Sequence, residues 1–220
     1  MVRPKAWEKL VSDSNGSFPD SSAIALLLID VINDLEFAEG EQLLEQGLPM
    51  ARRLAEFKKR ASKNSIPAIY VNDNFGQWRS DFRSVVKHCM DPSSRGAPIA
   101  KLLRPQEDDY FVLKPKHSGF YSTTLDVLLE YLHVDKLIVT GIAANICVLF
   151  TANDAYMRDF ALYVPEDCVA SNTPEETSYA LTQMHKVLKA DIRDSAEIDL
   201  TNIAGIETVS RRQPRRSAGC

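Results

Sequence analysis

The 220-residue chain has few of the features that define disulfide-rich, metal-binding or membrane proteins. Its four cysteines form no C-x-x-C pair, so they indicate neither a disulfide framework nor a zinc site. No segment approaches the ~20 apolar residues that span a bilayer, and residues 1–19 lack the apolar core of a secretory signal. We therefore expect a protein of the reducing cytoplasm, with no metal and no contact with a membrane.

A basic surface is missing as well. The net charge of −4 and the isoelectric point near 5.6 exclude the general positive footprint of a nucleic-acid-binding protein. The one basic cluster falls in a short C-terminal tail, at about residues 208–220, and residues 1–20 are expected to form an N-terminal arm. We see no internal repeat and no long linker, so the simplest organisation is one domain over residues 1–220.

Continuous apolar runs predict buried strands, because they lack the alternation of a half-solvated sheet. Segments with helical periodicity lie between them. This alternation predicts an α/β fold with a parallel sheet covered on both faces. The strands are expected at 24–30, 68–72, 110–114, 137–140 and 161–164, and the helices at 42–61 (regular from near Pro49), 123–132, 145–158 (with Asn145 as N-cap) and 174–190 (after Thr173), with a partly helical excursion at 80–105.

Three chemically reactive residues fall where strands end, and ligands of open parallel sheets bind at those carboxyl ends. Asp30 closes the first apolar run, Lys114 closes the run 110–114, and Cys147 follows the run 137–140. Each has an ordinary alternative: a capping carboxylate, an exposed lysine like Lys116, or a buried structural cysteine. Together they predict a nucleophilic thiol, an adjacent base and a cationic partner.

The position of Cys147 at the start of a helix predicts a reactive thiol. Unpaired N–H groups and the helix dipole favour a thiolate over a thiol there. Alkylation separates the two alternatives, because a thiol of low pKa reacts at neutral or mildly acidic pH and an inert core thiol does not. The backbone N–H groups of the same turn are candidates for an oxyanion hole.

Three motifs in order carry a resemblance. The segments Leu-Ile-Asp-Val-Ile-Asn-Asp (28–34), Lys-Pro-Lys-His-Ser-Gly-Phe (114–120) and Gly-Ile-Ala-Ala-Asn-Ile-Cys-Val (141–148) resemble the isochorismatase-like cysteine hydrolase superfamily. The resemblance covers about residues 23–171 and extends to about 195. It implies a three-layer sandwich with a mostly parallel six-stranded central sheet flanked by helices on both faces. It also implies homodimers or homotetramers.

The resemblance assigns roles to individual residues. The superfamily's Asp-Lys-Cys triad falls on Asp30, Lys114 and Cys147, with Lys114 preferred to Lys116 for its spacing to Phe120. A non-proline cis peptide of the superfamily would fall at Ile142–Ala143. It would direct the N–H groups of Ala143 and Cys147 at an oxyanion.

The cysteine implies hydrolysis of an amide or ureido-type C–N bond of a small molecule through a thioester, without a cofactor, because the true isochorismatases of this fold work without a cysteine nucleophile. A metal-dependent nicotinamidase is disfavoured, because Phe75 stands where the Asp-x-His metal motif would need histidine. Whether Asp73 or His117 touches substrate stays open. Residues expected to line the pocket, from loops after strand ends, are Phe37, Asn72, Phe75, Trp78, Phe120 and Tyr121.

Other functions remain open at this point. The site would equally suit hydrolysis of another bond, such as an ester or a lactam. A non-catalytic family member acting as a binding or scaffold protein would need none of the triad residues. A redox-sensing thiol would need a resolving cysteine near Cys147, and no sequence neighbour supplies one.

Overall fold

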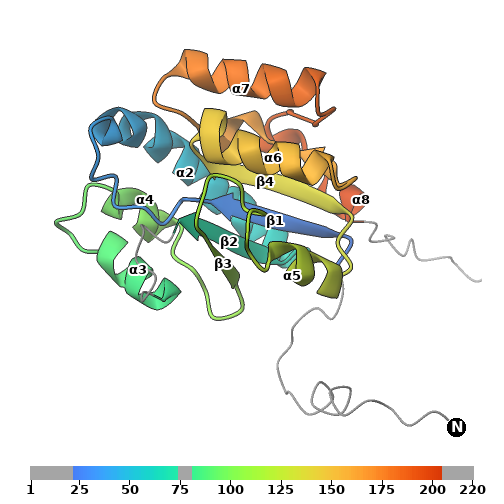
Figure 1. Cartoon of the computed structure of the whole chain (residues 1–220), viewed down its shortest axis with the longest axis horizontal. Helices are drawn as coiled ribbons and strands as arrows, with labels where there is room; N and C mark the ends of the chain where they lie inside the picture. Colours follow the sequence, from blue (N-terminus) through green and yellow to red (C-terminus); the bar gives the residue numbers. More distant parts are fainter. Residues whose placement is uncertain (1–21, 74–80, 205–220) are drawn as a thin grey trace, which may run out of the picture.

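A parallel six-stranded sheet forms the centre of the protein in this computed structural model, which describes residues 22–73 and 81–204 (Figure 1). The strand order is β3-β2-β1-β4-β5, and β6 pairs with β4. Every pairing is parallel. The strands are β1 (Ile24–Ile29), β2 (Ala68–Asp73), β3 (Tyr110–Lys114), β4 (Lys136–Ile142), β5 (Ala161–Tyr163) and β6 (Val169–Ala170).

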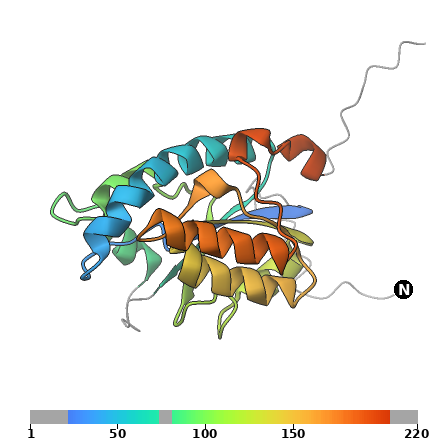
Figure 2. The ribbon, with the colours of Figure 1, turned by 90° about the horizontal axis from the view of Figure 1, so that it is seen from above.

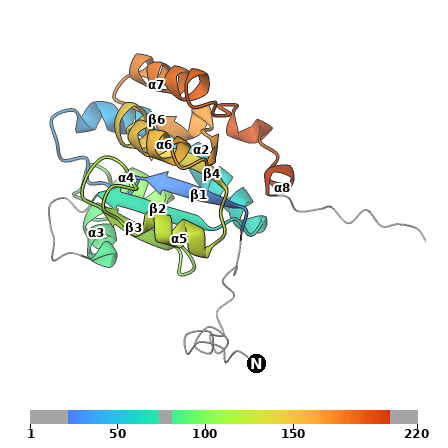
Figure 3. The ribbon, with the colours of Figure 1, turned by 45° about the vertical axis from the view of Figure 1, so that its right-hand side comes forward.

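Helices cover both faces of this sheet. Alternate residues of β1 enter two separate hydrophobic clusters, since successive side chains of a strand point to opposite faces. Figure 2 shows α6 and α7 side by side, and Figure 3 shows β1, β2 and β3 next to one another. One cluster includes residues of α2 (Gly40–Lys63), α3 (Phe82–Cys89), α4 (Ala97–Leu102) and α8 (Leu200–Ile203); the other includes residues of α5 (Leu125–Tyr131), α6 (Leu149–Tyr156) and α7 (Pro174–Lys186).

The predicted fold class is therefore confirmed: helices flank both faces of a parallel central sheet. The strand predicted at 110–114 has the observed bounds, and α7 begins at Pro174 behind a capping box formed by Thr173 and Glu176. β6 was not predicted, because two residues are too short to show a period. The N-terminal arm and the C-terminal tail lie outside the described residues.

Two predicted helix starts are wrong. α2 begins at Gly40 and runs through Pro49. A proline inside a helix costs about 3 kcal/mol, and here the turn before it is held by packing, because Leu43 and Gly47 are buried. Asn145 is not an N-cap: it lies inside a π-helical turn, Ala144–Val148, and its N–H donates to Ser171 Oγ at 3.2 Å.

Within the described ranges, none of the helices combines the length and apolarity needed to cross a bilayer.

Candidate active site

The side chains of Asp30, Lys114 and Cys147 meet at the carboxyl edge of the sheet. The buried ammonium of Lys114 lies 2.8 Å from Asp30 Oδ2 and 3.5 Å from Cys147 Sγ. It also donates to the backbone carbonyl of Lys116, at 3.2 Å, while Lys116 itself is exposed. The structure thus brings the three predicted residues together, and of the two lysines it is Lys114 whose ammonium contacts both Asp30 and Cys147.

Asp30 is fixed from two sides. Its Oδ1 accepts a hydrogen bond of 2.7 Å from the N–H of Asp73, while its Oδ2 faces Lys114. The residue is 5% exposed and has a positive φ of 49°, a conformation that aspartate tolerates better than most residues. Asp73 Oδ2 lies 3.9 Å from Lys114 Nζ, so Asp73 helps to hold the ion pair.

The electrostatics of the site differ from the sequence-based expectation. Burial raises the pKa of the Cys147 thiol to about 12; the charge of Asp30 acts in the same direction, and Lys114 opposes both. This direction is opposite to the one that the helix start alone favours, because the cost of desolvating a thiolate exceeds the help from the helix start.

The carboxylate and the ammonium are coupled. Burial raises the pKa of Asp30 above its usual value, although Lys114 and the hydrogen bonds oppose the shift. Burial lowers the pKa of Lys114, but nearby negative charge, chiefly that of Asp30, outweighs it and leaves that pKa raised. A carboxylate with a raised pKa is a better acceptor for a thiol proton, so Asp30 has the chemistry of a general base.

The turn that carries Cys147 depends on Gly141. Gly141 has φ of +111°, and a Cβ there would collide with the carbonyl oxygen of Ile29 on the paired strand. The Ile142–Ala143 peptide bond is cis, at the position that the resemblance implies. Ala143 occupies the N-cap position of the π turn, so the oxyanion hole expected from the N–H groups of Ala143 and Cys147 would lie at a helix start, where backbone donors are characteristically unpaired.

The role of Thr151 was not predicted from the sequence. Its buried hydroxyl donates to the carbonyl of Cys147 at 2.7 Å and accepts from the N–H of Gly119 at 2.9 Å. It thereby links the helix of Cys147 to the loop that follows Lys114. The spacing between Cys147 and Thr151 could have indicated this contact, because residues four apart in a helix lie on one face.

His117 lies beside the thiol. Its Nδ1 is 3.8 Å from Cys147 Sγ, and its ring centroid is 5.5 Å from that of Phe150. The side chain is exposed, unlike that of Lys114. The structure thus places an imidazole beside the sulfur, in addition to Asp30 and Lys114.

The predicted pocket residues lie in different environments. Phe120 is 4% exposed and packs in the core against Phe160, so its assignment to a substrate pocket is corrected. Phe37 and Tyr121 are exposed, and Asn72 is buried with its Nδ2 donating to the carbonyl of Ile32 at 2.6 Å. The predictions for Phe75 and Trp78 lie outside the described residues.

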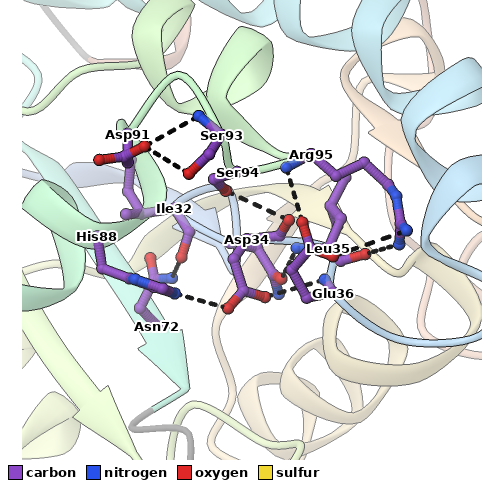
Figure 4. A network of polar contacts seen from close by, with 11 residues as sticks. Ile32, Asp34, Leu35, Glu36, Asn72, His88, Asp91, Ser93, Ser94 and Arg95 are labelled. Carbon is purple, nitrogen blue, oxygen red and sulfur yellow. Dashed lines mark hydrogen bonds and ion pairs between the residues drawn. The ribbon is translucent and has the colours of Figure 1, made fainter.

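The loop after β1 begins with Asp30. A polar network fixes the part of this loop that follows, from Ile32 to Glu36 (Figure 4). Asp34 Oδ2 contacts His88 Nε2 at 2.9 Å, and Arg95 donates to the carbonyl of Leu35 at 2.5 Å. The network therefore ties α3 and the segment before α4 to the loop that begins with Asp30.

Over the ranges 22–73 and 81–204, no three or more His, Cys, Asp and Glu side chains are grouped to hold a metal ion.

Fold and site together define a class: an α/β protein with a cysteine, an aspartate and a lysine at the carboxyl edge of a parallel sheet. The isochorismatase domain model matches residues 24–197, and the chain belongs to the isochorismatase family of hydrolases.

The chain is similar to known proteins over most of its length in two cases and over a third of it in another. The isochorismatase family protein YaaI of Bacillus subtilis is 44% identical over 174 residues, which cover 79% of this chain and 95% of that protein. The crystal structure of N-carbamoylsarcosine amidase from Thermoplasma acidophilum matches with a TM-score of 0.60 and 26% identity, covering 80% of this chain and 98% of the other. Ureidoacrylate amidohydrolase RutB of Pantoea ananatis is 40% identical over 73 residues, which cover 33% of this chain and 29% of that protein.

Proposed function

We propose that this family member hydrolyses an amide or ureido-type C–N bond of a small molecule through a thioester on Cys147. The observation that carries the proposal is the double contact of Lys114, whose buried ammonium touches both Asp30 and Cys147. A buried cation at this place stabilises the negative charge that passes from the carboxylate to the sulfur and back during proton transfer.

The first half of the reaction uses the triad. The Cys147 thiol gives its proton to Asp30, and the sulfur attacks the substrate carbonyl carbon. The N–H groups of Ala143 and Cys147 would bind the resulting oxyanion. Collapse breaks the C–N bond, the leaving nitrogen takes the proton from Asp30, and a thioester remains.

The second half consumes water. Water attacks the thioester carbonyl, the C–S bond breaks, and the acid leaves while the sulfur regains a proton. Two relatives support a C–N bond as the target, because their names identify them as an amidase and an amidohydrolase. No cofactor is part of this scheme.

Ammonia release tests the proposal. A panel of small primary amides and ureido acids is offered to the native protein and to Cys147→Ala, with Cys89→Ala as the control that removes another thiol. We expect release by the native and control proteins and none by Cys147→Ala. Release that survives in Cys147→Ala would remove Cys147 as the nucleophile.

The same triad suits a second bond type. An ester needs the same attack by sulfur but has no nitrogen leaving group, and a lactam opens with its nitrogen still attached to the product. Neither releases ammonia, so esters and lactams are added to the panel and acid formation is followed as well. Acid without ammonia would assign the protein to this alternative, and no turnover of any compound would favour a binding or scaffold role. A cytoplasmic location and a homodimer or homotetramer belong to the proposal, and light scattering after gel filtration tests the assembly.

A further inference from the structure

The sulfur of Cys147 contacts two nitrogen groups of opposite accessibility. Lys114 Nζ, at 3.5 Å, is completely buried, whereas His117 Nδ1, at 3.8 Å, belongs to an exposed side chain. An imidazole can accept a proton from water and later return it, because the ordinary pKa of histidine lies near neutrality. The proposed mechanism of Asp30, Lys114 and Cys147 does not use this imidazole.

The loop that carries His117 is anchored to the helix that continues from Cys147. The imidazole ring packs against Phe150 of α6. The next residue, Ser118, donates its hydroxyl to Asp154, and Gly119 donates its N–H to Thr151 Oγ1. All three partners belong to α6, so the position of the imidazole relative to the sulfur is set by one rigid element.

Asp30 is poorly placed for the water step. One of its oxygens accepts from the N–H of Asp73, the other faces Lys114, and only 5% of the residue is exposed. The attacking water must reach the acyl carbon from solvent. A water hydrogen-bonded to His117 Nδ1 can also lie within about 3–3.5 Å of a carbonyl carbon bound to Sγ, which is the separation needed for attack.

We propose that His117 is a further catalytic residue, the general base for hydrolysis of the thioester on Cys147; this rests on the proposed function. Neutral Nδ1 takes a proton from water while the water oxygen bonds to the acyl carbon. The tetrahedral intermediate collapses, the C–S bond breaks, and the acid leaves. The sulfur then takes the proton back from the imidazolium, which restores the thiol and the neutral imidazole.

4-Nitrophenyl acetate isolates this step. Its nitrophenolate leaves without a proton, so acetylation of Cys147 appears as a burst, and the slower phase reports hydrolysis of the acetyl thioester. In His117→Gln we expect a burst of native amplitude and a slow phase reduced about a hundredfold, the lower end of the usual contribution of a general base. Intact-mass measurement should show the acetyl-enzyme accumulating. Hydroxylamine should restore turnover, because it attacks thioesters without a base.

The matched control is His133→Asn. His133 lies just after α5, has a positive φ of 58° that asparagine tolerates, and is exposed. Both phases should be native in this variant. A slow phase of native rate in His117→Gln would overturn the role of His117 alone. Loss of the burst in that variant, with native circular dichroism, would move His117 to the acylation step and overturn the assignment to hydrolysis. No acetylation of Cys147 in the native protein would overturn the proposed function and this inference with it.

Discussion

Lys114 Nζ lies 2.8 Å from Asp30 Oδ2, and its side chain has no exposed surface. A buried ion pair of this kind contributes little net stability, because desolvation of both charges offsets their attraction. The ion pair instead fixes positions, because the ammonium holds the carboxylate and the sulfur at one point of the sheet edge. The pair therefore connects the fold to the proposed chemistry.

Replacing Lys114 by methionine should destabilise the protein by about 3–5 kcal/mol, because the charge of Asp30 stays buried without its partner. The free energy of unfolding in urea measures this. Lys116→Met, which changes an exposed side chain two residues away, should cost less than about 0.5 kcal/mol. The double variant Asp30→Asn with Lys114→Met should recover much of the lost stability but no activity. A single variant as stable as the native protein would contradict a structural pair.

The thiol of Cys147 should alkylate slowly at neutral pH, because burial and Asp30 raise its pKa to about 12. Asp30→Asn removes a charge that disfavours the thiolate while Lys114 remains, so the pKa of Cys147 should fall. Each unit of that fall raises the alkylation rate at pH 8 about tenfold. The rate with iodoacetamide, followed at the peptide that contains Cys147, measures it.

The same variant should hydrolyse nothing, because its base is missing. Faster alkylation with lost catalysis separates a base from a group that merely activates the thiol electrostatically. Asp135→Asn, an exposed carboxylate at the opposite end of the sheet, should alkylate like the native protein. Slower alkylation in Asp30→Asn would show that Asp30 favours the thiolate, against the direction derived from the structure.

Thr151→Val should lower both stability and turnover. The methyl that replaces the hydroxyl leaves the N–H of Gly119 without its acceptor, and an unsatisfied buried group costs about 1–3 kcal/mol. Thr151→Ser keeps the hydroxyl and should retain most of the turnover. Urea unfolding and steady-state kinetics measure the two effects. Equal turnover in the valine and serine variants would show that the link between the helix of Cys147 and the loop after Lys114 has no part in catalysis.

Gly141→Ala should destabilise the protein by at least about 1–2 kcal/mol, since an L-residue is strained at φ of +111° and its Cβ meets the backbone of Ile29. Gly47→Ala is the matched control. There the new Cβ would meet only the Cδ1 atom of Ile99, a movable side-chain end, and alanine favours the helix by about 0.5–1 kcal/mol. Thermal unfolding compares the two. A tolerated alanine at position 141 would show that the approach of β4 to β1 can relax.

The sequence predicted the features that depend on local pattern. Buried strands appear as continuous apolar runs, and the capping box at Thr173 is a short-range signal, so β1, β3 and the start of α7 were placed well. The gathering of Asp30, Lys114 and Cys147 followed from one topological rule, that the carboxyl ends of parallel strands meet at one edge. The assignment of their roles came from the resemblance of three motifs, and it remains a proposal.

Other features needed the tertiary structure, because they depend on contacts between distant segments. Pro49 stays inside α2 because buried residues before and after it pack in the core under the sheet. Local helix propensity does not include such packing. Phe120 turns into the core against Phe160 instead of toward a pocket. The direction of the pKa shift at Cys147 depends on how much water reaches the sulfur and on a carboxylate 117 positions away in the chain.

The sequence by itself determined which residues end the strands, and so which chemical groups share the edge of the sheet. The tertiary structure decided the direction in which the pKa of the thiol shifts and brought the His117 imidazole to within 3.8 Å of the sulfur. The physical reason is that hydrophobic periodicity is written into neighbouring residues, whereas desolvation and side-chain distance are properties of the packed chain.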